Sequence, residues 1–368
     1  MIAATGVSRW RDAMRIVMIA PPWYDVPPQG YGGIESMLAE LVAGLSRRGH
    51  HITLIGAGRP GTAARFLATY DPPPSERIGE PMPEVLHAAK AYALAVDIDA
   101  DLVHDHSLAG PLSAAARAVP TVVTCHGEID GELGEYYRAL GPAVSMVGIS
   151  EAQRRFAPDL NWAGVVHNAV ETASFPFREH KEDWVLWLGR LNEDKGAHVA
   201  IDVARAAGRR ILLAGKLTEP LEHDYFEREV RPRLGPDAEY LGEADAARKR
   251  ELLAAARCLL FPILWEEPFG MVMIEAMACG TPVVALNRGA VPEVVVDGVT
   301  GLVRNEVEEL AEAVEAVGAL DPHACRSHVA DNFDVEVMTV RYERVYRQII
   351  TTPEEPAGGT RDLALPVT

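Results

Sequence analysis

Residues 259–286, LLFPILWEEPFGMVMIEAMACGTPVVAL, give the most informative signal of the fold because they contain a complete strand–helix–strand unit. Residues 259–262 and 282–286 are short apolar runs, typical of buried strands. Between them Pro268 suits the start of a helix, and Gly280 followed by Pro282 marks its end. This order predicts a βαβ unit and therefore a parallel sheet.

Working outward, the same alternation of short apolar runs and helical patterns covers most of the chain. A helix with an apolar face from Ile34 to Leu45 ends at Gly49, and Ser150 with Gln153 three positions later suits the start of another. An alternation that restarts in the middle fits two α/β domains better than a closed barrel, which needs eight regular repeats. The expected strands lie at 15–20, 52–55, 102–104, 121–124 and 144–149, then at 184–188, 211–214, 238–241, 259–262 and 282–286.

The pattern predicts five parts of the chain. We expect an N-terminal extension at 1–13, with Met14 as an alternative start, and a first domain at 14–172. A second domain at 173–332 follows a hinge at 165–176. A helix at 333–350 comes next, and the Pro- and Gly-containing residues 351–368 are expected to be a disordered tail.

Length and charge exclude several classes of protein. The 368 residues are too many for one ordinary core, and 48% hydrophobic residues exclude wholesale disorder. A formal charge of −18 argues against a nucleic-acid partner and allows at most a weak peripheral membrane contact. It does not exclude a small basic pocket.

The four cysteines and the chain start bear on the compartment. Cys125, Cys258, Cys279 and Cys325 show no CxxC spacing, so we expect reduced, buried thiols, with one disulfide pair as the alternative. Charged residues interrupt the first positions, and no run of 18 uncharged apolar residues occurs, so we expect neither a secretory signal nor a spanning helix. These features predict a cytoplasmic protein.

Two nucleotide-binding motifs fail on inspection. The loop at 30–35 follows a strand and opens a helix, but Glu35 occupies the third glycine position of a dinucleotide fingerprint. Near Gly215-Lys216, Arg210 replaces the first glycine of a phosphate loop and Leu217 replaces its Ser or Thr. Neither of these motifs is therefore present.

Two clusters could suggest metal ligands. The acidic run at 97–101 precedes a strand, the wrong end for a ligand, so we interpret it as a solvated connection. His104, Asp105 and His106 end a strand, and His126 could approach from the next one. Further acidic ligands are not evident there, so we expect no metal.

Carboxylates and cations gather where strands are expected to end. Glu267 lies just before the helix of the opening stretch, and Glu275 lies about two turns into it. Backbone amides at 269–271 would form an anion site, with Arg190 and Lys195 as cations beside it. This set suits a ligand with hydroxyls on either side of a diphosphate, although Arg190 and Lys195 could instead pair with Glu193 or Asp194.

The E-x7-E segment from Glu267 to Glu275 resembles that of the retaining nucleotide-sugar glycosyltransferases of family four. Gly189-Arg190-x4-Lys195 and Gly32-Gly33-Ile34-Glu35 match the same family, and the resemblance extends from Met14 to about Ile350. It implies the GT-B fold: two Rossmann-like domains that face each other across a cleft, with the C-terminal helix crossing back to the first domain. It also implies a donor on the second domain and no metal ion.

The resemblance assigns a role to each matching position. Glu275 would hold ribose hydroxyls, Glu267 sugar hydroxyls, and Arg190 with Lys195 the leaving diphosphate. His126 would lie beside the transferred sugar as a further catalytic residue. The remaining donor-binding positions would be Gly32, Gly33, Leu241, Phe269, Gly270 and Met271. Residues 287–290 depart from the family because they lack the paired glycines that often precede Val291-Pro292-Glu293.

The resemblance implies transfer of a hexose from a nucleoside-diphosphate sugar, UDP- or GDP-linked, with retention of configuration and no cofactor. The acceptor is unknown, and residues 21–30 and 128–137 are its candidate walls. Alternatives are a sugar-nucleotide epimerase on the same fold, a phosphorylase-like transferase without a nucleotide, and a non-catalytic sugar-nucleotide sensor. The first would need acids and histidines aimed at the sugar, and no clear set is present.

Overall fold

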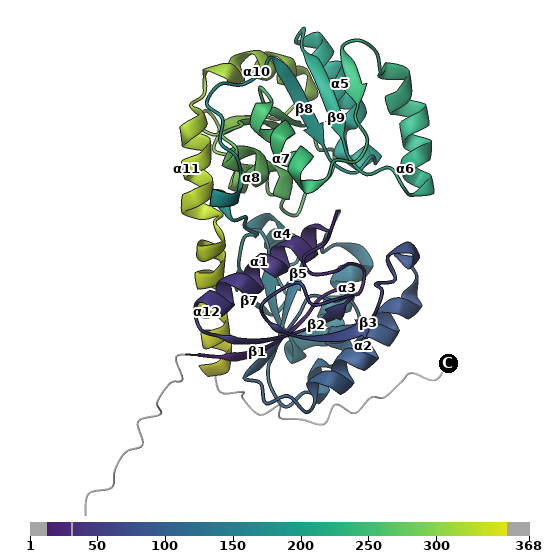
Figure 1. Ribbon diagram of the computed structural model, residues 1–368, viewed down its shortest axis with the longest axis vertical. Coiled ribbons are helices and arrows are strands. Elements are labelled where there is room, and N and C mark those ends of the chain that lie inside the picture. Colours follow the sequence, from purple (N-terminus) through teal and green to yellow (C-terminus); the bar gives the residue numbers. More distant parts are fainter. Residues whose placement is uncertain (1–12, 31, 352–368) are drawn as a thin grey trace, which may run out of the picture.

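Two parallel sheets form the two halves of the molecule in a computed structural model that describes residues 13–30 and 32–351 (Figure 1). The first sheet has seven strands in the order β3-β2-β1-β4-β5-β6-β7. The second has six in the order β10-β9-β8-β11-β12-β13. Within the described residues, the strands of both sheets pair in parallel, and helices cover the sheets (Figure 1). The predicted pair of Rossmann-like α/β halves is therefore confirmed.

The first half runs from β1 to β7. Its strands are β1 Arg15–Ile19, β2 His51–Ala57, β3 Arg65–Tyr70, β4 Leu102–Asp105, β5 Thr121–Cys125, β6 Ser145–Gly148 and β7 Trp162–Val165. Its helices are α1 Gly33–Arg47, α2 Pro81–Ala95, α3 Gly131–Leu140 and α4 Glu151–Phe156. Short 3-10 turns occupy Ser75–Arg77, Gly110–Ala116, Gly141–Ala143 and Thr172–Ser174.

The second half repeats the alternation. Its strands are β8 Trp184–Leu188, β9 Arg210–Ala214, β10 Ala238–Tyr240, β11 Leu259–Phe261, β12 Val283–Leu286 and β13 Gly301–Arg304. Its helices are α5 Ala197–Ala206, α6 Pro220–Tyr225, α7 Ala246–Ala255, α8 Met271–Ala278, α9 Val291–Val294, α10 Leu310–Ala316 and α11 Pro322–Asn332, and α12 Val335–Thr351 follows them. Single turns of 3-10 or π helix lie at Glu193–Lys195, Phe226–Val230, Arg231–Arg233, Val307–Glu309 and Val317–Ala319.

Three strands were missed by the sequence pattern, namely β3, β7 and β13. All three are edge strands, paired on one side only. None of the four residues of β7 is fully buried, and β3 contains a single buried residue. An edge strand needs no continuous apolar run, so the signal that identified the central strands is absent there.

The last helix returns to the first half, as the family resemblance implied. Figure 1 shows α11 beside the second half and α12 running on along the first. Met338, Tyr342 and Tyr346 of α12 are buried in one cluster with Leu38 and Leu41 of α1. The helices approach so closely that a Cβ at Gly44 would lie 2.1 Å from the Thr339 hydroxyl.

The chain therefore crosses between the halves twice, and the two crossings touch. Val170 pairs with Asp334 in a parallel bridge, and the Thr172 amide donates to the Asp334 carboxylate at 3.1 Å. The predicted extension at 1–13 and tail at 351–368 lie outside the described residues, except for residues 13 and 351.

Two other expectations can be compared with the structure. The four cysteines are buried and unpaired, so the disulfide alternative is wrong. In the acidic run, Asp99 and Asp101 form ion pairs with Arg15, the latter at 2.6 Å, at the amino end of β1. No helix within residues 13–30 and 32–351 combines the length and the apolar character needed to cross a bilayer.

Candidate functional site

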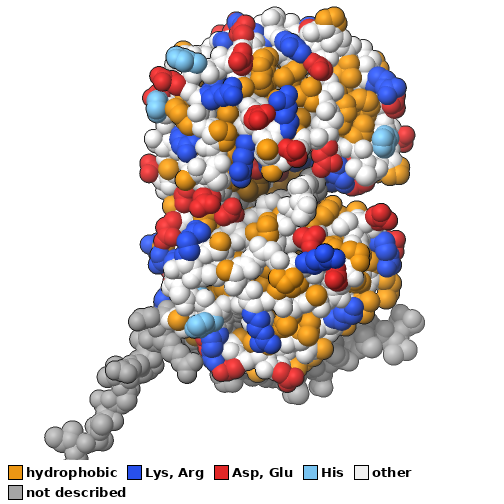
Figure 2. Space-filling view, in the orientation of Figure 1, with side chains coloured by type: hydrophobic (Ala, Val, Ile, Leu, Met, Phe, Trp, Pro, Cys, Tyr) orange, Lys and Arg blue, Asp and Glu red, His pale blue; other side chains and the backbone are white. Residues whose placement is uncertain are grey.

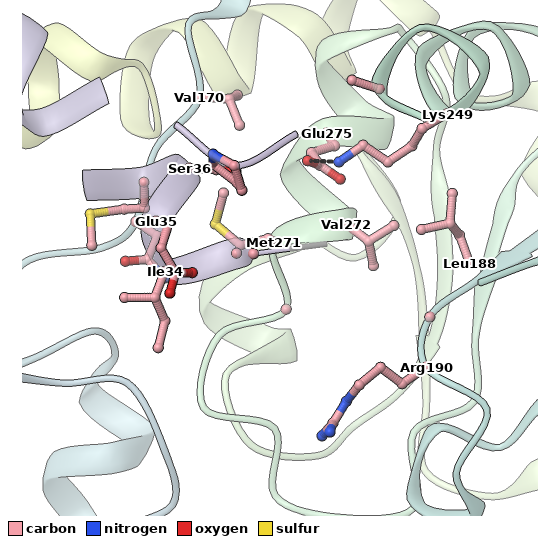
Figure 3. A pocket seen from close by; sticks show the side chains of 18 of the residues that line it. Ile34, Glu35, Ser36, Val170, Leu188, Arg190, Lys249, Met271, Val272 and Glu275 are labelled. Atoms are coloured by element: carbon pink, nitrogen blue, oxygen red, sulfur yellow. Dashed lines mark hydrogen bonds and ion pairs between the residues drawn. The ribbon is translucent and has the colours of Figure 1, made fainter. Parts of the chain in front are cut away.

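A cavity of about 700 Å³ lies between the two halves, where the molecular surface is hollowed (Figure 2). Loops that follow β1, β5 and β6 line it from the first half, and loops that follow β8, β9, β10 and β11 line it from the second. Carboxyl ends of parallel strands are where open α/β sheets bind ligands. Figure 3 shows α1 on one side of this cavity and Arg190, Val272 and Glu275 on the other.

All the predicted site residues except Leu241 line this cavity. Leu241 instead packs against the core of the second half, and its amide donates to Leu213 in continuation of the sheet. Glu243 and Ala244, next along the chain, do line the cavity. Of the two acceptor walls, residues 21–30 contribute Trp23 and Tyr24, whereas none of residues 128–137 belongs to the lining.

Lys195 and Glu267 form the central ion pair of the site. The Lys195 ammonium contacts Glu267 Oε2, and the Trp265 indole donates to the same oxygen at 3.0 Å. The expected alternative, pairing of Lys195 with Glu193 or Asp194, is wrong. Arg190 also lines the cavity, and it forms no ion pair with any residue within the described ranges.

Two glycines bring the cation-bearing loops together. A Cβ at Gly215 would lie 1.7 Å from the Gly189 carbonyl oxygen, so the loops after β8 and β9 are in backbone contact. A Cβ at Gly196 would lie 2.3 Å from the Pro262 carbonyl oxygen, and Gly196 has φ 66°. Only glycine fits at such an approach without displacing backbone, so these glycines hold Arg190 and Lys195 at the edge of the sheet.

The backbone of Glu267 is held by the loop in which the paired glycines are missing. Gly289 has φ 52°, and a Cβ there would lie 2.2 Å from the Glu267 carbonyl oxygen. The Gly289 amide donates to Glu266 Oε2 at 2.6 Å, and the Ala290 amide donates to the Glu267 carbonyl at 2.9 Å. The single glycine of this loop therefore occupies the position of closest contact with Glu267.

Helix α8 starts later than the sequence predicted. It begins at Met271, with Gly270 as its N-cap at φ 81°, so Pro268 lies outside the helix. Glu275 is consequently about one turn from the helix start, not two. The first-turn amides carry partial positive charge and border the cavity beside Phe269, Gly270 and Met271.

Glu275 has a partner that the sequence reasoning missed. Lys249 of α7 donates to Glu275 Oε1 at 2.6 Å, and both residues line the cavity (Figure 3). Glu275 is 9% exposed, so Lys249 neutralises a nearly buried carboxylate. The sequence carried one signal for this partner: α7 follows β10, so α7 begins at the sheet edge where the site lies.

Glu35 is a second residue that the sequence reasoning missed as part of the site. It lies in the first turn of α1, lines the cavity and is 3% exposed. Burial raises its pKa to about 7. A Cβ at Gly32 would lie 3.2 Å from Glu35 Oε2, whereas Gly33 has open space around it.

His126 lines the cavity and is held by a second histidine. Its Nε2 and His106 Nδ1 are 2.9 Å apart, which leaves His126 Nδ1 as the ring nitrogen available to a ligand. His104 bonds Thr124 at 2.8 Å and Tyr346 at 2.7 Å. Burial lowers the pKa of His126 to about 4 and that of His104 to about 3, so both rings are neutral near pH 7.

Asp105, which lies between His104 and His106, has a structural role. Asp105 is fully buried and forms an ion pair with Arg117 at 2.9 Å, and it accepts a hydrogen bond from Ser107 at 2.7 Å. Within the described ranges, no group of three His, Cys, Asp or Glu side chains has the arrangement of a metal site.

Comparison with known proteins relates both halves of the chain to glycosyltransferases. Residues 31–173 match the family described as "Glycosyltransferase Family 4", and residues 182–319 match "Glycosyl transferases group 1". The alpha-maltose-1-phosphate synthase of Mycobacterium tuberculosis is 30% identical, over 91% of this chain and 100% of its own length.

Solved structures agree with these matches. AviGT4, a glycosyltransferase of avilamycin A biosynthesis, superimposes with a TM-score of 0.69 at 26% identity, over 92% of this chain and 98% of its own. HepE of Anabaena, solved with UDP and glucose, has a TM-score of 0.71 at 19% identity, over 91% of this chain and 99% of its own.

Proposed function

The chain belongs to glycosyltransferase family 4, and from this premise we propose that it transfers a hexose from a nucleoside-diphosphate sugar to an acceptor hydroxyl, with retention and without a metal ion. One observation carries the proposal. A single cavity places the Lys195–Glu267 pair, Arg190 and the start of α8 together, with the Glu275–Lys249 pair farther along α8. This order matches a sugar, a diphosphate and a ribose.

In this proposal the second half binds the donor. Glu275 accepts hydrogen bonds from the ribose hydroxyls, and its ion pair with Lys249 holds the nearly buried carboxylate in place. Arg190, Lys195 and the first-turn amides of α8 bind the diphosphate. Glu267 binds hydroxyls of the sugar.

Catalysis in this proposal is electrostatic. Cleavage of the bond to the anomeric carbon puts negative charge on the leaving diphosphate, and fixed cations stabilise that charge more in the transition state than in the ground state. Arg190 and Lys195 provide charge that a metal ion supplies in other transferases. Lys195 contacts Glu267, so a diphosphate bound by Lys195 lies next to the carboxylate that binds the sugar.

Retention is proposed from the surroundings of the sugar. Glu267 Oε2 accepts hydrogen bonds from Lys195 and the Trp265 indole. A carboxylate engaged in this way is better suited to binding hydroxyls than to attacking a carbon atom. We therefore propose attack of the acceptor from the face that the diphosphate leaves. The neutral His126 contributes Nδ1 to the sugar beside that face.

A donor panel tests the function. The protein is incubated with UDP-, GDP- and ADP-hexoses with and without EDTA, and nucleotide release and the anomer of the product are followed by NMR. We expect release from at least one donor, unaffected by EDTA, with an α-donor giving an α-product. Inversion or loss of activity in EDTA would contradict the finer proposal.

A variant tests the cations. Replacing both cations, Arg190→Ala with Lys195→Ala, should lower kcat by about 10²-fold or more, since this removes the charges that face the leaving group. The matched control is Arg178→Ala, which removes a positive charge outside the site and leaves Lys249 and Glu275 unchanged. Arg178 is exposed and is not part of the cavity lining. A double variant with the wild-type rate would exclude the proposed role.

A further inference from the structure

One short segment of the second half touches both the Glu267 loop and the first half. At its start, the Gly289 amide donates to Glu266 Oε2, and the Ala290 amide donates to the Glu267 carbonyl. Four residues after Gly289, Glu293 of α9 accepts hydrogen bonds from the first half: Oε2 from the Glu151 amide at 2.7 Å and Oε1 from the Ala152 amide at 2.5 Å. The segment 289–293 therefore connects Glu267 to helix α4.

Glu293 contacts the start of α4 through both of its carboxylate oxygens. Glu151 and Ala152 are the first residues of α4, where amides lack partners within the helix and favour a negative charge. The Glu293 side chain is 15% exposed and also contacts His167 Nε2 at 3.2 Å. Burial alone would raise the pKa of Glu293, but the bonds from His167 and the two amides lower it below its ordinary value.

On the other side, α4 holds the loop that carries His126. Gln153 of α4 donates from Nε2 to two carbonyls, that of Cys125 at 3.0 Å and that of Gly127 at 2.6 Å. These carbonyls belong to the residues immediately before and after His126. Gln153 is 3% exposed, and its Oε1 accepts from the Ile149 amide at 2.9 Å, so its amide group is fully engaged.

We propose that Glu293 and Gln153 are positioning residues, which together set His126 of the first half relative to Glu267 of the second. The connection consists of three sets of hydrogen bonds joined by two short stretches of backbone, residues 290–293 and 151–153. The bonds run from the Ala290 amide to the Glu267 carbonyl, from the first amides of α4 to Glu293, and from Gln153 to both neighbours of His126. This inference rests on the proposed function, because it assumes that His126 and Glu267 act on the same sugar. Neither Glu293 nor Gln153 lines the cavity, so both act through other residues.

The kinetic test compares kcat with donor affinity. Glu293→Ala should lower kcat at least tenfold while the Kd for the donor changes less than twofold, because the donor contacts of Arg190 and Glu275 remain. Glu293→Gln keeps one acceptor oxygen and should show a smaller loss of kcat. The matched control is Glu308→Ala, an exposed glutamate of the second half, which should equal the wild type.

A double-mutant cycle tests whether the two residues act in one series. Gln153→Ala should lower kcat by a similar factor, and the double variant Glu293→Ala/Gln153→Ala should lose much less than the product of the two factors. Independent, multiplying effects would overturn the proposal. So would a fall in kcat that only follows the fraction of folded protein, measured by thermal unfolding of the same samples.

Amide hydrogen exchange separates this inference from the proposed function. In the free protein, Glu293→Ala should speed exchange in a peptide covering residues 124–128, about 10-fold or more, and Glu308→Ala should not. If the wild type turned over no donor, the proposed function would fail, and the positioning series would still be judged by this exchange. Unchanged exchange at 124–128 would overturn the series whatever the activity.

Discussion

Glu35→Gln should change how the stability of the first half depends on pH. The Glu35 side chain is 3% exposed at the start of α1, and burial raises its pKa from 4.5 to about 7. The folded state thus binds a proton more tightly than the unfolded state. The resulting stabilisation is fully present below pH 4.5 and is lost as the pH rises through about 7.

The size of the effect follows from the shift. A rise from 4.5 to about 7 is about 2.5 pH units, and each unit corresponds to about 1.4 kcal/mol. The free energy of unfolding of the wild type should therefore fall by about 3 kcal/mol, relative to Glu35→Gln, between pH 4.5 and pH 8. The glutamine does not titrate and keeps nearly the same shape, so it removes this dependence while leaving the packing around Gly32 and Pro28.

The assay is urea unfolding of both proteins at pH 5, 6, 7 and 8. The two halves need not unfold together, so each transition is analysed separately. Glu76→Gln, at an exposed position of the same half, is the control and should parallel the wild type at every pH. If the difference between wild type and Glu35→Gln were the same at pH 5 and pH 8, the buried carboxyl would not titrate as the structure requires.

Four further outcomes are expected. Glu275→Ala should weaken donor binding by about 1.5–3 kcal/mol, the usual range for a hydrogen bond to a charged group. Calorimetry with UDP-, GDP- or ADP-sugars measures this difference, and equal affinities of the variant and the wild type would show that Glu275 does not bind the donor. Gly289→Ala places a Cβ 2.2 Å from the Glu267 carbonyl at φ 52° and should lower kcat strongly in a protein that still folds, so a wild-type rate would contradict the contact. Arg117→Leu leaves the fully buried Asp105 without its ion-pair partner and should cost about 3–5 kcal/mol of unfolding free energy, checked by denaturant titration against the exposed Arg138→Leu. Burial raises the pKa of Cys125 to about 11 and the pKa of Cys258, Cys279 and Cys325 to about 12. A thiol reagent at pH 8 should therefore label these cysteines only after the protein unfolds. Rapid labelling of the native protein would refute this expectation.

The central strands could be predicted because each is a local apolar run. Residues 259–261 and 283–286 are all buried, and the pattern of their sequence shows it directly. The edge strands β3 and β7 could not be predicted in this way, because half-exposed residues carry no such run. Their pairing depends on the neighbouring strand, which lies elsewhere in the sequence.

The site likewise has features that could be predicted from the sequence and features that could not. The sequence pattern showed which residues follow the carboxyl ends of strands, and this was enough to predict that Arg190, Lys195, Glu267 and Glu275 lie in one site. The burial that raises the pKa of Glu35 was invisible in the sequence, because it arises from the tertiary packing around the start of α1.

The partner of each charged side chain depends on the packing of the folded chain. Lys195 pairs with Glu267, 72 positions away, and not with its neighbours, while Lys249 reaches Glu275 from another helix. Glu293 contacts α4 across the two halves, 142 positions from Glu151. Strand order and periodicity are local properties of the chain, whereas the distance between two side chains is set by how sheets and helices pack, so residue types could be predicted from the sequence and their partners could not.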